Sequence, residues 1–321
     1  MSQLVNTHVR GEVLRHISLA ERPLIVILGP TASGKTAFSV ELALMINQTS
    51  PFEKGDWKEA EIINADSRQL YRQLNIGTAK TTPTEMKGIP HHLIDIVDPD
   101  SDVTAAWYKE QATAKIKEIQ ERKNVPLLVG GSMLYLSAVI DDLRFASPAD
   151  PKLRKKLEEE YDRDEGASLY RQIEERDPQT AQSFHRKNKP YVIRAAELLA
   201  SGKKPSAVKK KGLPPFDLLI YGMEWKREEL NGRINSRTHQ MLENGWVEEV
   251  EGLMDRGYSP KDPGMKSEGY REIMAFLRGD MEKEDLEKYI AAKTRQYAKR
   301  QMTWWGKDQR IRWISISSQK E

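Results

Sequence analysis

The sequence predicts an α/β fold in which helices cover a parallel sheet and an all-helical domain is inserted into the core. Short apolar runs alternate with longer helical stretches over the first 140 of the 321 residues, which is typical of parallel sheets buried on both faces. Strand-like runs are absent between about residues 141 and 211, where charged helical segments replace them, and they resume at Phe216. We therefore expect a first part of the core over 1–140, a helical insertion over 141–211, and a second part of the core with a basic C-terminal helix over 212–321.

The expected strands are apolar runs that end at glycine or at a polar residue. They are Pro23–Leu28, Glu61–Ala65, His91–Asp95, Val125–Val129, Phe216–Met223 and Ile311–Ile316. In the core, helices are expected at Ala37–Ile46, Ala105–Arg122, Arg227–Glu243, Val247–Arg256, Tyr270–Leu277 and Lys283–Trp305. In the insertion they are expected at Pro151–Tyr161, Gly166–Arg176, Pro178–His185 and Pro190–Ala200. Residues 1–22 carry only scattered apolar side chains, and no element is assigned to them.

The composition is that of a soluble enzyme. Hydrophobic residues make up 38% and charged residues 31% of the chain, and no apolar run approaches the roughly 20 residues that span a bilayer. The chain contains no cysteine, which excludes disulfides, thiolate nucleophiles and thiolate metal sites. No secretion signal is visible. We expect a cytoplasmic protein.

The segment Gly29–Thr36 matches the phosphate-binding pattern G-x-x-x-x-G-K-[ST] in full. It also lies where the pattern requires, after an expected strand and before an expected helix. Gly34 lets the backbone approach phosphate oxygens, Lys35 supplies positive charge, and the Thr36 hydroxyl can bind Mg²⁺. The core is therefore predicted to be P-loop NTPase-like, with three layers.

The loop alone does not decide between a nucleoside triphosphate and another diphosphate. In P-loop ATPases a later strand usually ends in an Asp that holds Mg²⁺. Here the run Val125–Val129 ends in Gly130 and Gly131, and the carboxylate at a strand end is Asp66, after the second strand. This arrangement disfavours an ordinary ATPase without excluding it.

Further motifs follow the phosphate loop along the chain. They are Asp66-Ser-Arg-Gln69, Tyr71 with Ile76-Gly-Thr-Ala-Lys80, His91-His-Leu-Ile-Asp95, Gly130-Gly-Ser-Met-Leu-Tyr135, Ile193-Arg-Ala195, Gly269-Tyr-Arg271 and the segment from Thr294 to Trp304. In this order and combination the chain resembles the tRNA dimethylallyltransferase (tRNA isopentenyltransferase) family, from about Pro23 to Trp305. There are two departures: Tyr191 stands where many members have a basic residue, and Lys266-Ser-Glu268 precedes Gly269 where a less charged sequence is usual.

The resemblance implies transfer of a dimethylallyl group from dimethylallyl diphosphate to the exocyclic amine of the adenosine 3′-adjacent to the anticodon in tRNA. It implies that core and insertion grip the anticodon arm of the tRNA, and that Asp66, Thr31 and Arg233 are catalytic. The implied diphosphate-binding residues are Gly29, Thr31, Ala32, Ser33, Gly34, Lys35, Thr36, Arg227 and Arg233. The implied tRNA-binding residues are Asp66, Ser67, Arg68, Gln69, Ser132, Arg154, Arg194, Gln296 and Arg300. Mg²⁺, with Thr36 as a ligand, is the expected cofactor, and a monomer is the expected state.

Asp66 has a chemical reason to be the base. The exocyclic amine of adenine is a poor nucleophile, so a carboxylate that accepts its proton during bond formation would help. An N-cap or a water-mediated Mg²⁺ ligand is the alternative role for Asp66. Arg227 and Arg233 are six residues apart and would not share one helical face. We therefore expect Arg227 before the helix or in its first turn. Without the resemblance, a surface helix residue is the simpler interpretation of each arginine.

Two groups of basic residues are candidate phosphate-binding surfaces. They are Lys203, Lys204, Lys209, Lys210 and Lys211, and Lys293, Arg295, Lys299, Arg300, Lys307, Arg310 and Arg312. Solvated helix faces are the simpler interpretation, and a net charge of +3 does not decide between the two. Candidate stacking partners for an unstacked base are Tyr71, Tyr135, Trp304 and Trp305, with the core as the alternative for the two tryptophans. The histidines form no recognisable metal set, and His91 and His92 are interpreted as structural.

Three other functions use parts of the same pattern. A small-molecule or nucleotide kinase would use the loop for ATP but has little need of two basic surfaces. A prenyltransferase acting on free adenine nucleotides shares Gly29–Thr36 and Asp66 but does not need the insertion. A non-catalytic RNA-binding protein leaves Asp66 without a purpose.

Overall fold

The computed structural model describes residues 5–49, 56–145, 150–208 and 211–316. The chain divides into two compact units, Met1–Ile140 with Pro215–Glu321, and Asp141–Pro214. The second unit ends at Pro214 rather than at Lys211, because residues near this end bond back to the first residue of the unit. The Gly212 amide donates to the Asp141 carbonyl oxygen at 2.9 Å, and the Lys211 ammonium lies 2.9 Å from the Asp141 carboxylate.

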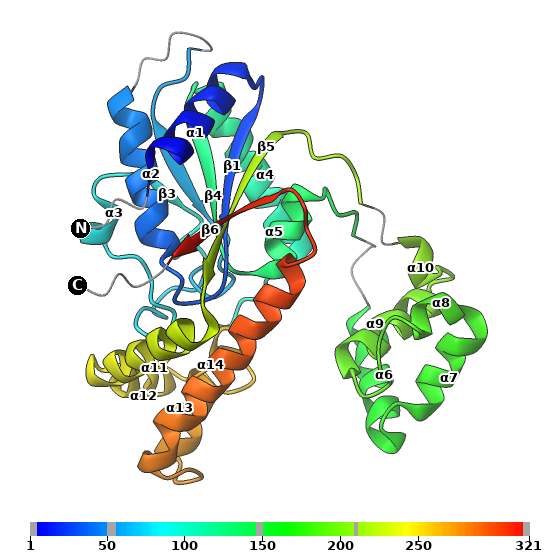
Figure 1. The fold of residues 1–321 in the computed structure, drawn as a ribbon. Coiled ribbons are helices and arrows are strands. Elements are labelled where there is room, and N and C mark those ends of the chain that lie inside the picture. Colours follow the sequence, from blue (N-terminus) through cyan, green and yellow to red (C-terminus); the bar gives the residue numbers. More distant parts are fainter. Residues whose placement is uncertain (1–4, 50–55, 146–149, 209–210, 317–321) are drawn as a thin grey trace. The chain divides into compact units, whose positions relative to one another are not determined.

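Six strands form one parallel sheet in the part of the first unit that the structure describes (Figure 1). They are β1 (Pro23–Leu28), β2 (Ala60–Asn64), β3 (His91–His92), β4 (Val125–Gly130), β5 (Asp217–Trp225) and β6 (Ile311–Ile316), in the order β3-β2-β4-β1-β5-β6. Ile25 of β1, for example, pairs with Leu127 of β4 and with Leu219 of β5. The carboxyl ends of parallel strands meet at one edge, where open α/β sheets bind ligands. The expected fold class is confirmed.

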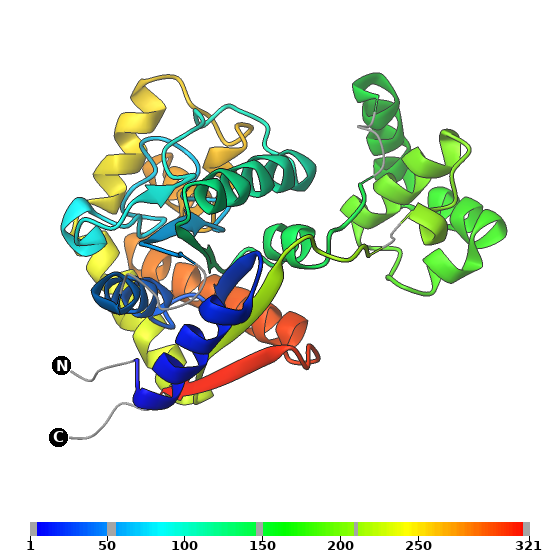
Figure 2. The same cartoon turned by 90° about the horizontal axis from the view of Figure 1, so that it is seen from above.

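Helices cover both faces of this sheet, which gives three layers (Figure 2). On one face α1 (Thr7–Leu19) and α2 (Lys35–Thr49) pack against Ile25 and Ile27. On the other face α4 (Ala105–Glu121) and α5 (Met133–Ile140) pack against Leu24, Val26 and Leu28. Successive strand residues point to opposite faces, so β1 is apolar throughout because both of its faces are buried.

The structure differs most from the expected elements at α1 and β3. It also contains helices at Pro83–Met86, Met133–Ile140 and Pro205–Val208 that were not expected, and the helix expected over Pro178–His185 ends at Ala181. In α1, Val9, Val13 and Ile17 are buried and four residues apart, which is a helical period set in an otherwise polar stretch. Strand β3 stops at His92 instead of continuing to Asp95. Leu93 and Asp95 adopt φ angles of 59° and 55°, which extended strands do not allow.

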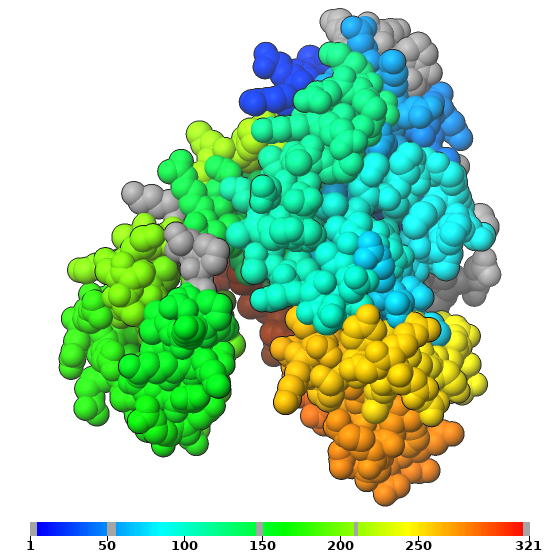
Figure 3. All heavy atoms as spheres, turned by 180° about the vertical axis from the view of Figure 1, so that it is seen from behind, coloured from blue at the N-terminus to red at the C-terminus, as the bar shows by residue number. Residues whose placement is uncertain are grey.

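The C-terminal helices form a block below the carboxyl edge of the sheet. They are α11 (Arg227–Glu243), α12 (Trp246–Asp255), the 3₁₀ helix η1 (Gly264–Lys266), α13 (Tyr270–Leu277) and α14 (Lys283–Trp305). The block (yellow and orange in Figure 3) lies against the loops that follow β2 (cyan). There the Glu249 carboxylate accepts hydrogen bonds from the backbone amides of residues 75–77 and from the Tyr270 hydroxyl, the last at 2.6 Å. The short helix α3 (Pro83–Met86) precedes β3.

The second unit is helical, with a hydrophobic core of its own. Its helices are α6 (Pro151–Asp164), α7 (Ala167–Arg176), α8 (Pro178–Ala181), α9 (Lys189–Ala200) and α10 (Pro205–Val208). Leu157, Ile173 and Val192 belong to this core. The buried Asp177 carboxylate accepts from the Thr180 hydroxyl at 2.7 Å and from the Ser206 amide at 2.9 Å, which ties α10 to α8. In the described ranges no helix is long and apolar enough to cross a membrane.

Candidate active site

The phosphate loop joins β1 to α2 at the carboxyl edge of the sheet. Gly34 has a φ of +87°, in the left-handed region that favours glycine, and leads into α2, whose first amides have no intrahelical partner. The Lys35 ammonium donates to the Pro30 carbonyl oxygen at 2.6 Å. Among the residues that the structure describes, the buried Ser33 hydroxyl has no hydrogen-bond partner. Unpaired amides and a buried free hydroxyl together fit an anion that accepts hydrogen bonds.

Three cations converge on this loop. Burial lowers the pKa of Lys35 to about 8, while the Asp66 carboxylate opposes the shift and Arg237 adds to it. Burial also lowers the pKa of Arg237, again with Asp66 opposing the shift and Arg233 adding to it. The crowding of positive charge, with Asp66 as the nearby carboxylate, favours binding of a polyanion here.

Helix α11 supports the loop from the side. The Arg233 side chain donates through Nε to the Ala32 carbonyl oxygen at 2.9 Å. Its guanidinium lies 4.3 Å from the centre of the Trp225 ring, and the Trp225 indole N–H donates to the Ser33 carbonyl oxygen at 2.9 Å. Arg233 is therefore held at the loop by two contacts that fix its direction.

Asp66 lies just beyond the end of β2. Its amide donates to Asn64 Oδ1 at 2.9 Å, and Asn64 Nδ2 donates back to the Asp66 carbonyl oxygen at 3.0 Å. The Asp66 Oδ1 atom accepts from the Arg68 amide at 2.8 Å. Asn64 thus fixes the Asp66 backbone while the following turn fixes its carboxylate, and the side chain lines the cavity described below.

The end of β4 brings further polar groups to the same edge. The Ser132 hydroxyl accepts from the Ser67 amide at 2.8 Å and lies 3.1 Å from the Ser67 hydroxyl. The backbone of Ala65 passes so close to Gly130 that a Cβ atom at Gly130 would collide with it. Gly130 is therefore required for the close approach of the β2 and β4 ends.

Gln301 of α14 reaches the phosphate loop from the far end of the chain. It is fully buried, and its Oε1 accepts from the Thr31 amide at 2.9 Å while its Nε2 donates to the Gly131 carbonyl oxygen at 2.8 Å. A Cβ atom at Gly131 would collide with Gln301 Nε2. The two glycines at the end of β4, where an ATPase would offer a carboxylate, are thus both explained by close neighbours.

These groups line a cavity of about 1070 Å³ in the first unit, at the upper end of the usual size of ligand pockets. Twelve of the residues implied by the resemblance line it: Thr31, Ala32, Ser33, Gly34, Lys35, Thr36, Asp66, Ser67, Arg68, Gln69, Ser132 and Arg233. The cavity is also lined by Gln301, Arg237, Tyr297 and Glu268. A phosphate loop and a strand-end carboxylate therefore face one space.

Comparison with known proteins identifies the relatives of the chain. The family described as IPP transferase matches residues 69–308. The chain is 40% identical over 302 residues to the tRNA dimethylallyltransferase of Pelotomaculum thermopropionicum, covering 93% of this chain and 92% of that protein. The chain belongs to the tRNA dimethylallyltransferase family. It is also similar to two solved structures: the full-length tRNA isopentenylpyrophosphate transferase of Bacillus halodurans (36% identity, TM-score 0.66, 92% of this chain and 90% of that one) and a eukaryotic dimethylallyltransferase acting on tRNA (27%, 0.76, 92% and 74%).

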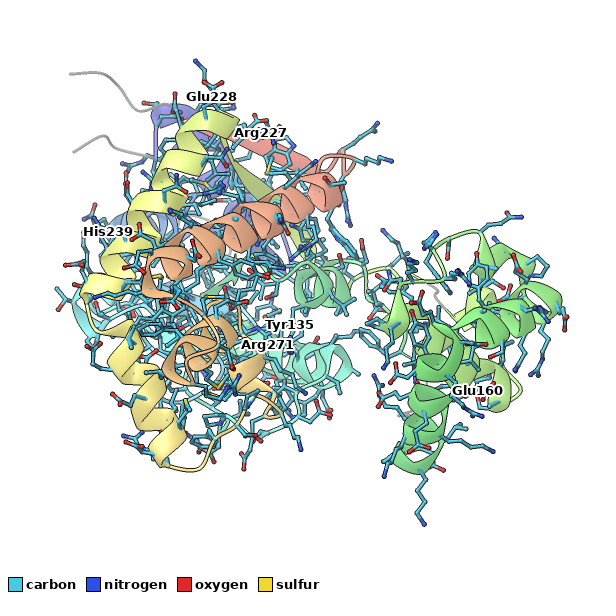
Figure 4. All side chains as sticks on the ribbon, turned by 90° about the horizontal axis from the view of Figure 1, so that it is seen from below. Tyr135, Glu160, Arg227, Glu228, His239 and Arg271 are labelled. Atoms are coloured by element: carbon cyan, nitrogen blue, oxygen red, sulfur yellow. The ribbon has the colours of Figure 1, made fainter. Side chains whose placement is uncertain are left out.

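Four of the expected site residues in the first unit do not line the cavity: Gly29, Arg227, Gln296 and Arg300. Arg227 is the first residue of α11 and is exposed (Figure 4). Six residues of helix turn it about 120° away from Arg233, which explains why the two do not meet at the loop. Arg300 forms an ion pair of 3.0 Å with Glu268. Burial raises the pKa of Glu268, while Arg300 and Arg68 oppose the shift.

Two further expected tRNA-binding residues, Arg154 and Arg194, lie in the second unit. Both pair with the buried Glu197 carboxylate, at 3.4 and 2.9 Å. Each guanidinium is about half exposed or less, so these arginines neutralise a buried charge on one side and face solvent on the other. The Arg154 pair links α6 to α9, whereas the Arg194 pair lies within α9.

The candidate stacking aromatics separate clearly. Trp305 and Tyr71 are buried in the hydrophobic core, at 2% and 3% exposure, which excludes them as stacking surfaces in this structure. Tyr135 lines the cavity and stacks on Tyr108, with ring centres 4.2 Å apart. Trp304 is 44% exposed, and its indole N–H donates to the Ser137 hydroxyl at 3.1 Å. Of the four, only Trp304 is exposed, because Tyr135 belongs to the core at 8% exposure although it lines the cavity.

The basic residues near the C-terminus are largely paired rather than free. Arg295 bonds to Asn235, Arg310 pairs with Asp308, and Arg312 pairs with Glu12 at 2.6 Å. In the insertion, Lys203 and Lys204 are exposed, and Lys211 pairs with Asp141. Lys209 and Lys210 lie outside the described residues. His92 is structural, because with Arg122 and Asn124 it holds the buried Glu61 carboxylate.

The polar groups at the loop fit a Mg²⁺ ion that a phosphate ligand carries. In the ranges that the structure describes, no group of three or more His, Cys, Asp or Glu side chains could hold a metal by itself. Mg²⁺ commonly keeps several waters and binds through phosphate oxygens with one or two protein ligands. The Thr36 hydroxyl, which lines the cavity at the start of α2, would be the protein ligand in such a site.

Sequence reasoning missed Arg237, Trp225 and Gln301. Arg237 follows Arg233 by four residues on a helix, so a search for basic pairs on one helical face would have found it. Trp225 carries no such signal. Gln301 lies within the motif from Thr294 to Trp304, but the motif does not indicate that this side chain contacts the loop, because the contact is made only by the tertiary fold.

Proposed function

We propose that the chain transfers a dimethylallyl group from dimethylallyl diphosphate to the exocyclic amine of the adenosine 3′-adjacent to the anticodon in tRNA, releasing diphosphate. The proposal is carried by one observation: the phosphate loop and the Asp66 carboxylate line the same cavity. A loop that holds the diphosphate of the donor and a base that faces the acceptor amine are the two components this reaction needs. The family to which the chain belongs supports tRNA as the acceptor.

In the proposed reaction the adenine N6 atom forms a bond to C1 of the allyl group. The bond between C1 and the diphosphate oxygen breaks, and its electron pair leaves with the diphosphate. N6 then has a proton to lose, and Asp66 accepts it. The Asn64 contacts and the Arg68 amide hold the Asp66 carboxylate in place for this transfer.

The departing diphosphate gains negative charge, which the loop is built to stabilise. Lys35, Arg233 and Arg237 supply positive charge, and the free Ser33 hydroxyl and the first amides of α2 supply hydrogen bonds. Thr31 would add its hydroxyl at the cavity wall. Mg²⁺, when held by Thr36, supplies further neutralisation of the leaving group.

The acceptor has to leave the anticodon loop to reach Asp66, at a cost of a few kcal/mol. Ser67, Arg68, Gln69 and Ser132 line the part of the cavity next to Asp66 and are the proposed contacts to the base and its backbone. The helical unit, with Arg154 and Arg194, is proposed as a second contact to the anticodon arm. We propose further that the enzyme is monomeric and cytoplasmic.

The test is incubation of the protein with unmodified tRNA, labelled dimethylallyl diphosphate and Mg²⁺, followed by nuclease mapping of the label. Label is expected on the adenosine next to the anticodon, and transfer should stop when that adenosine is replaced by guanosine. Parallel reactions with ATP and with free adenosine monophosphate test the kinase and nucleotide prenyltransferase functions. Transfer to adenosine monophosphate at an equal rate, or phosphate release from ATP without prenyl transfer, would overturn the proposal.

A further inference from the structure

We infer that Gln301 is a positioning residue that sets the geometry of the phosphate loop for catalysis, an inference that rests on the function proposed above. The starting observation is that its side chain lies within the cavity wall yet is only 1% exposed. A buried primary amide must satisfy both its oxygen and its nitrogen, or its burial costs free energy. Gln301 does so with the backbone of two different segments, both at the site.

The first bond fixes Thr31. The amide of Thr31 points to Gln301 Oε1 at 2.9 Å and is therefore directed away from a bound anion. In this loop the hydrogen bonds to diphosphate are left to residues further along, at the start of α2. Because this bond fixes the direction of its peptide group, the Thr31 side chain stays in the cavity wall. Gln301 thus determines which groups of the loop face the diphosphate.

The second bond ties the loop to the strand that carries the acceptor side. Gln301 Nε2 donates to the Gly131 carbonyl oxygen at 2.8 Å, and Ser132, next in the chain, bonds to Ser67 beside Asp66. Gly131 cannot carry a Cβ atom without displacing Gln301. One side chain therefore links the donor side of the cavity, at Thr31, to its acceptor side.

Helix α14 gives Gln301 a rigid base. The hydroxyl of Tyr297, one turn earlier, also reaches the Gly131 carbonyl oxygen, at 3.5 Å, and Trp305, one turn later, is buried in the core. The Gln301 side chain is consequently supported by the helical turns on both sides of it. A displacement of the loop by about 1 Å can cost about 100-fold in rate, so a fixed anchor of this kind has a direct catalytic value.

The experiment compares Gln301→Met with the wild-type enzyme. Methionine preserves length and approximate volume but makes neither bond. We expect the affinity for inorganic diphosphate, measured by calorimetry, to fall about tenfold or more, and turnover at saturating substrates to fall roughly 10- to 100-fold. Affinity for tRNA should stay within about twofold, since neither bond involves an RNA-facing group.

Gln120→Met is the matched control. Gln120 of α4 also donates to a backbone carbonyl of β1, that of Pro23 at 2.9 Å, but at the end of the strand opposite to the phosphate loop. This variant should lower the thermal unfolding midpoint without changing turnover or diphosphate affinity. The control therefore separates a general effect of losing a side-chain hydrogen bond from the specific effect of losing the Gln301 bonds.

A folded Gln301→Met enzyme with wild-type turnover and diphosphate affinity would overturn the inference. So would a variant that loses tRNA affinity in step with activity, because Gln301 would then act on the RNA side. If Gln301→Met fails to fold, Gln301→Asn replaces it, since asparagine keeps a neutral amide but is one methylene too short to reach both the Thr31 amide and the Gly131 carbonyl oxygen. Unchanged diphosphate affinity in that variant would equally refute the role. Absence of prenyl transfer to tRNA by the wild-type enzyme would instead refute the proposed function.

Discussion

The pH dependence of diphosphate binding should report the ionisation of Lys35. Its pKa of about 8 lies below the usual 10.5 for lysine because burial disfavours the charged ammonium. With that value about 90% of the ammonium is charged at pH 7 and about 10% at pH 9. If only the charged form attracts the ligand, the affinity for inorganic diphosphate should fall about tenfold between these two pH values, which is about 1.4 kcal/mol.

Calorimetric titration of the protein with inorganic diphosphate at fixed Mg²⁺, from pH 7 to pH 9.5, measures this fall. The control is Lys35→Arg, whose guanidinium stays charged over the whole range. Because diphosphate itself titrates in both experiments, the difference between the two profiles belongs to Lys35. Binding to the wild-type protein should also take up protons near pH 8, which the buffer-dependence of the enthalpy detects. Parallel profiles for the two proteins would show that Lys35 stays charged and that its burial does not matter to the ligand.

The site and the helical unit support three further predictions. Asp66→Ala should lower single-turnover rates by roughly two to four orders of magnitude with tRNA affinity nearly intact, and a near-normal rate would remove Asp66 from the chemistry. Arg237→Met should weaken diphosphate binding at least about tenfold because it removes a cation of the loop, whereas Arg227→Met should change it less than about twofold; equal effects in calorimetry would contradict the cavity described above. Replacing Lys203 and Lys204 by Gln should reduce the slope of log tRNA affinity against log salt concentration, by about one for each phosphate that the protein no longer neutralises. Turnover at saturating tRNA should stay unchanged. An unchanged slope would mean that these lysines are solvated and that the RNA is held elsewhere.

The sheet and the phosphate loop were predictable because local sequence determines them. Strand β1 is a continuous apolar run that both helical layers bury, and the loop after it follows a fixed pattern of residue types. The end of β3 was not predictable in the same way. Leu93 and Asp95 adopt positive φ angles there. This conformation is uncommon for leucine, so the sequence gives no reason to expect it.

Helix α1 shows a second limit. Its three buried residues, Val9, Val13 and Ile17, mark one face, but most other positions are polar or charged, and the exposed Leu19 lies off that face, so the helical period is weak. The helix is held by the sheet more than by its own sequence. Its Glu12 carboxylate accepts from the Tyr221 hydroxyl of β5 at 2.9 Å and from Arg312 of β6 at 2.6 Å. Such partners, about 200 or more residues away, leave no trace in the local pattern.

Within the site, residues whose role follows from a local motif were found, whereas contacts between distant segments were not. Thr36 and Asp66 each follow a strand closely, so their place at the carboxyl edge follows from the topology. Gln301 and Thr31 are 270 residues apart, and nothing in either segment announces their bond. Arg227 and Arg233 were partly predictable. Helical spacing correctly predicted that they lie on different faces of the helix, but it did not predict which of them faces the loop.

The close contact at Gly131 limits how this active site can change by mutation. Conversion to an enzyme that hydrolyses nucleoside triphosphates would need an acidic metal ligand at the end of β4. A side chain at Gly131 has to displace the Gln301 amide from its hydrogen bonds, and a side chain at Gly130 collides with the Ala65 backbone. A single substitution therefore breaks the existing site before it can create the new one. Either glycine can take an acidic ligand only if a neighbouring element, the end of β2 or α14, changes with it, which is a harder step for gradual selection than one substitution.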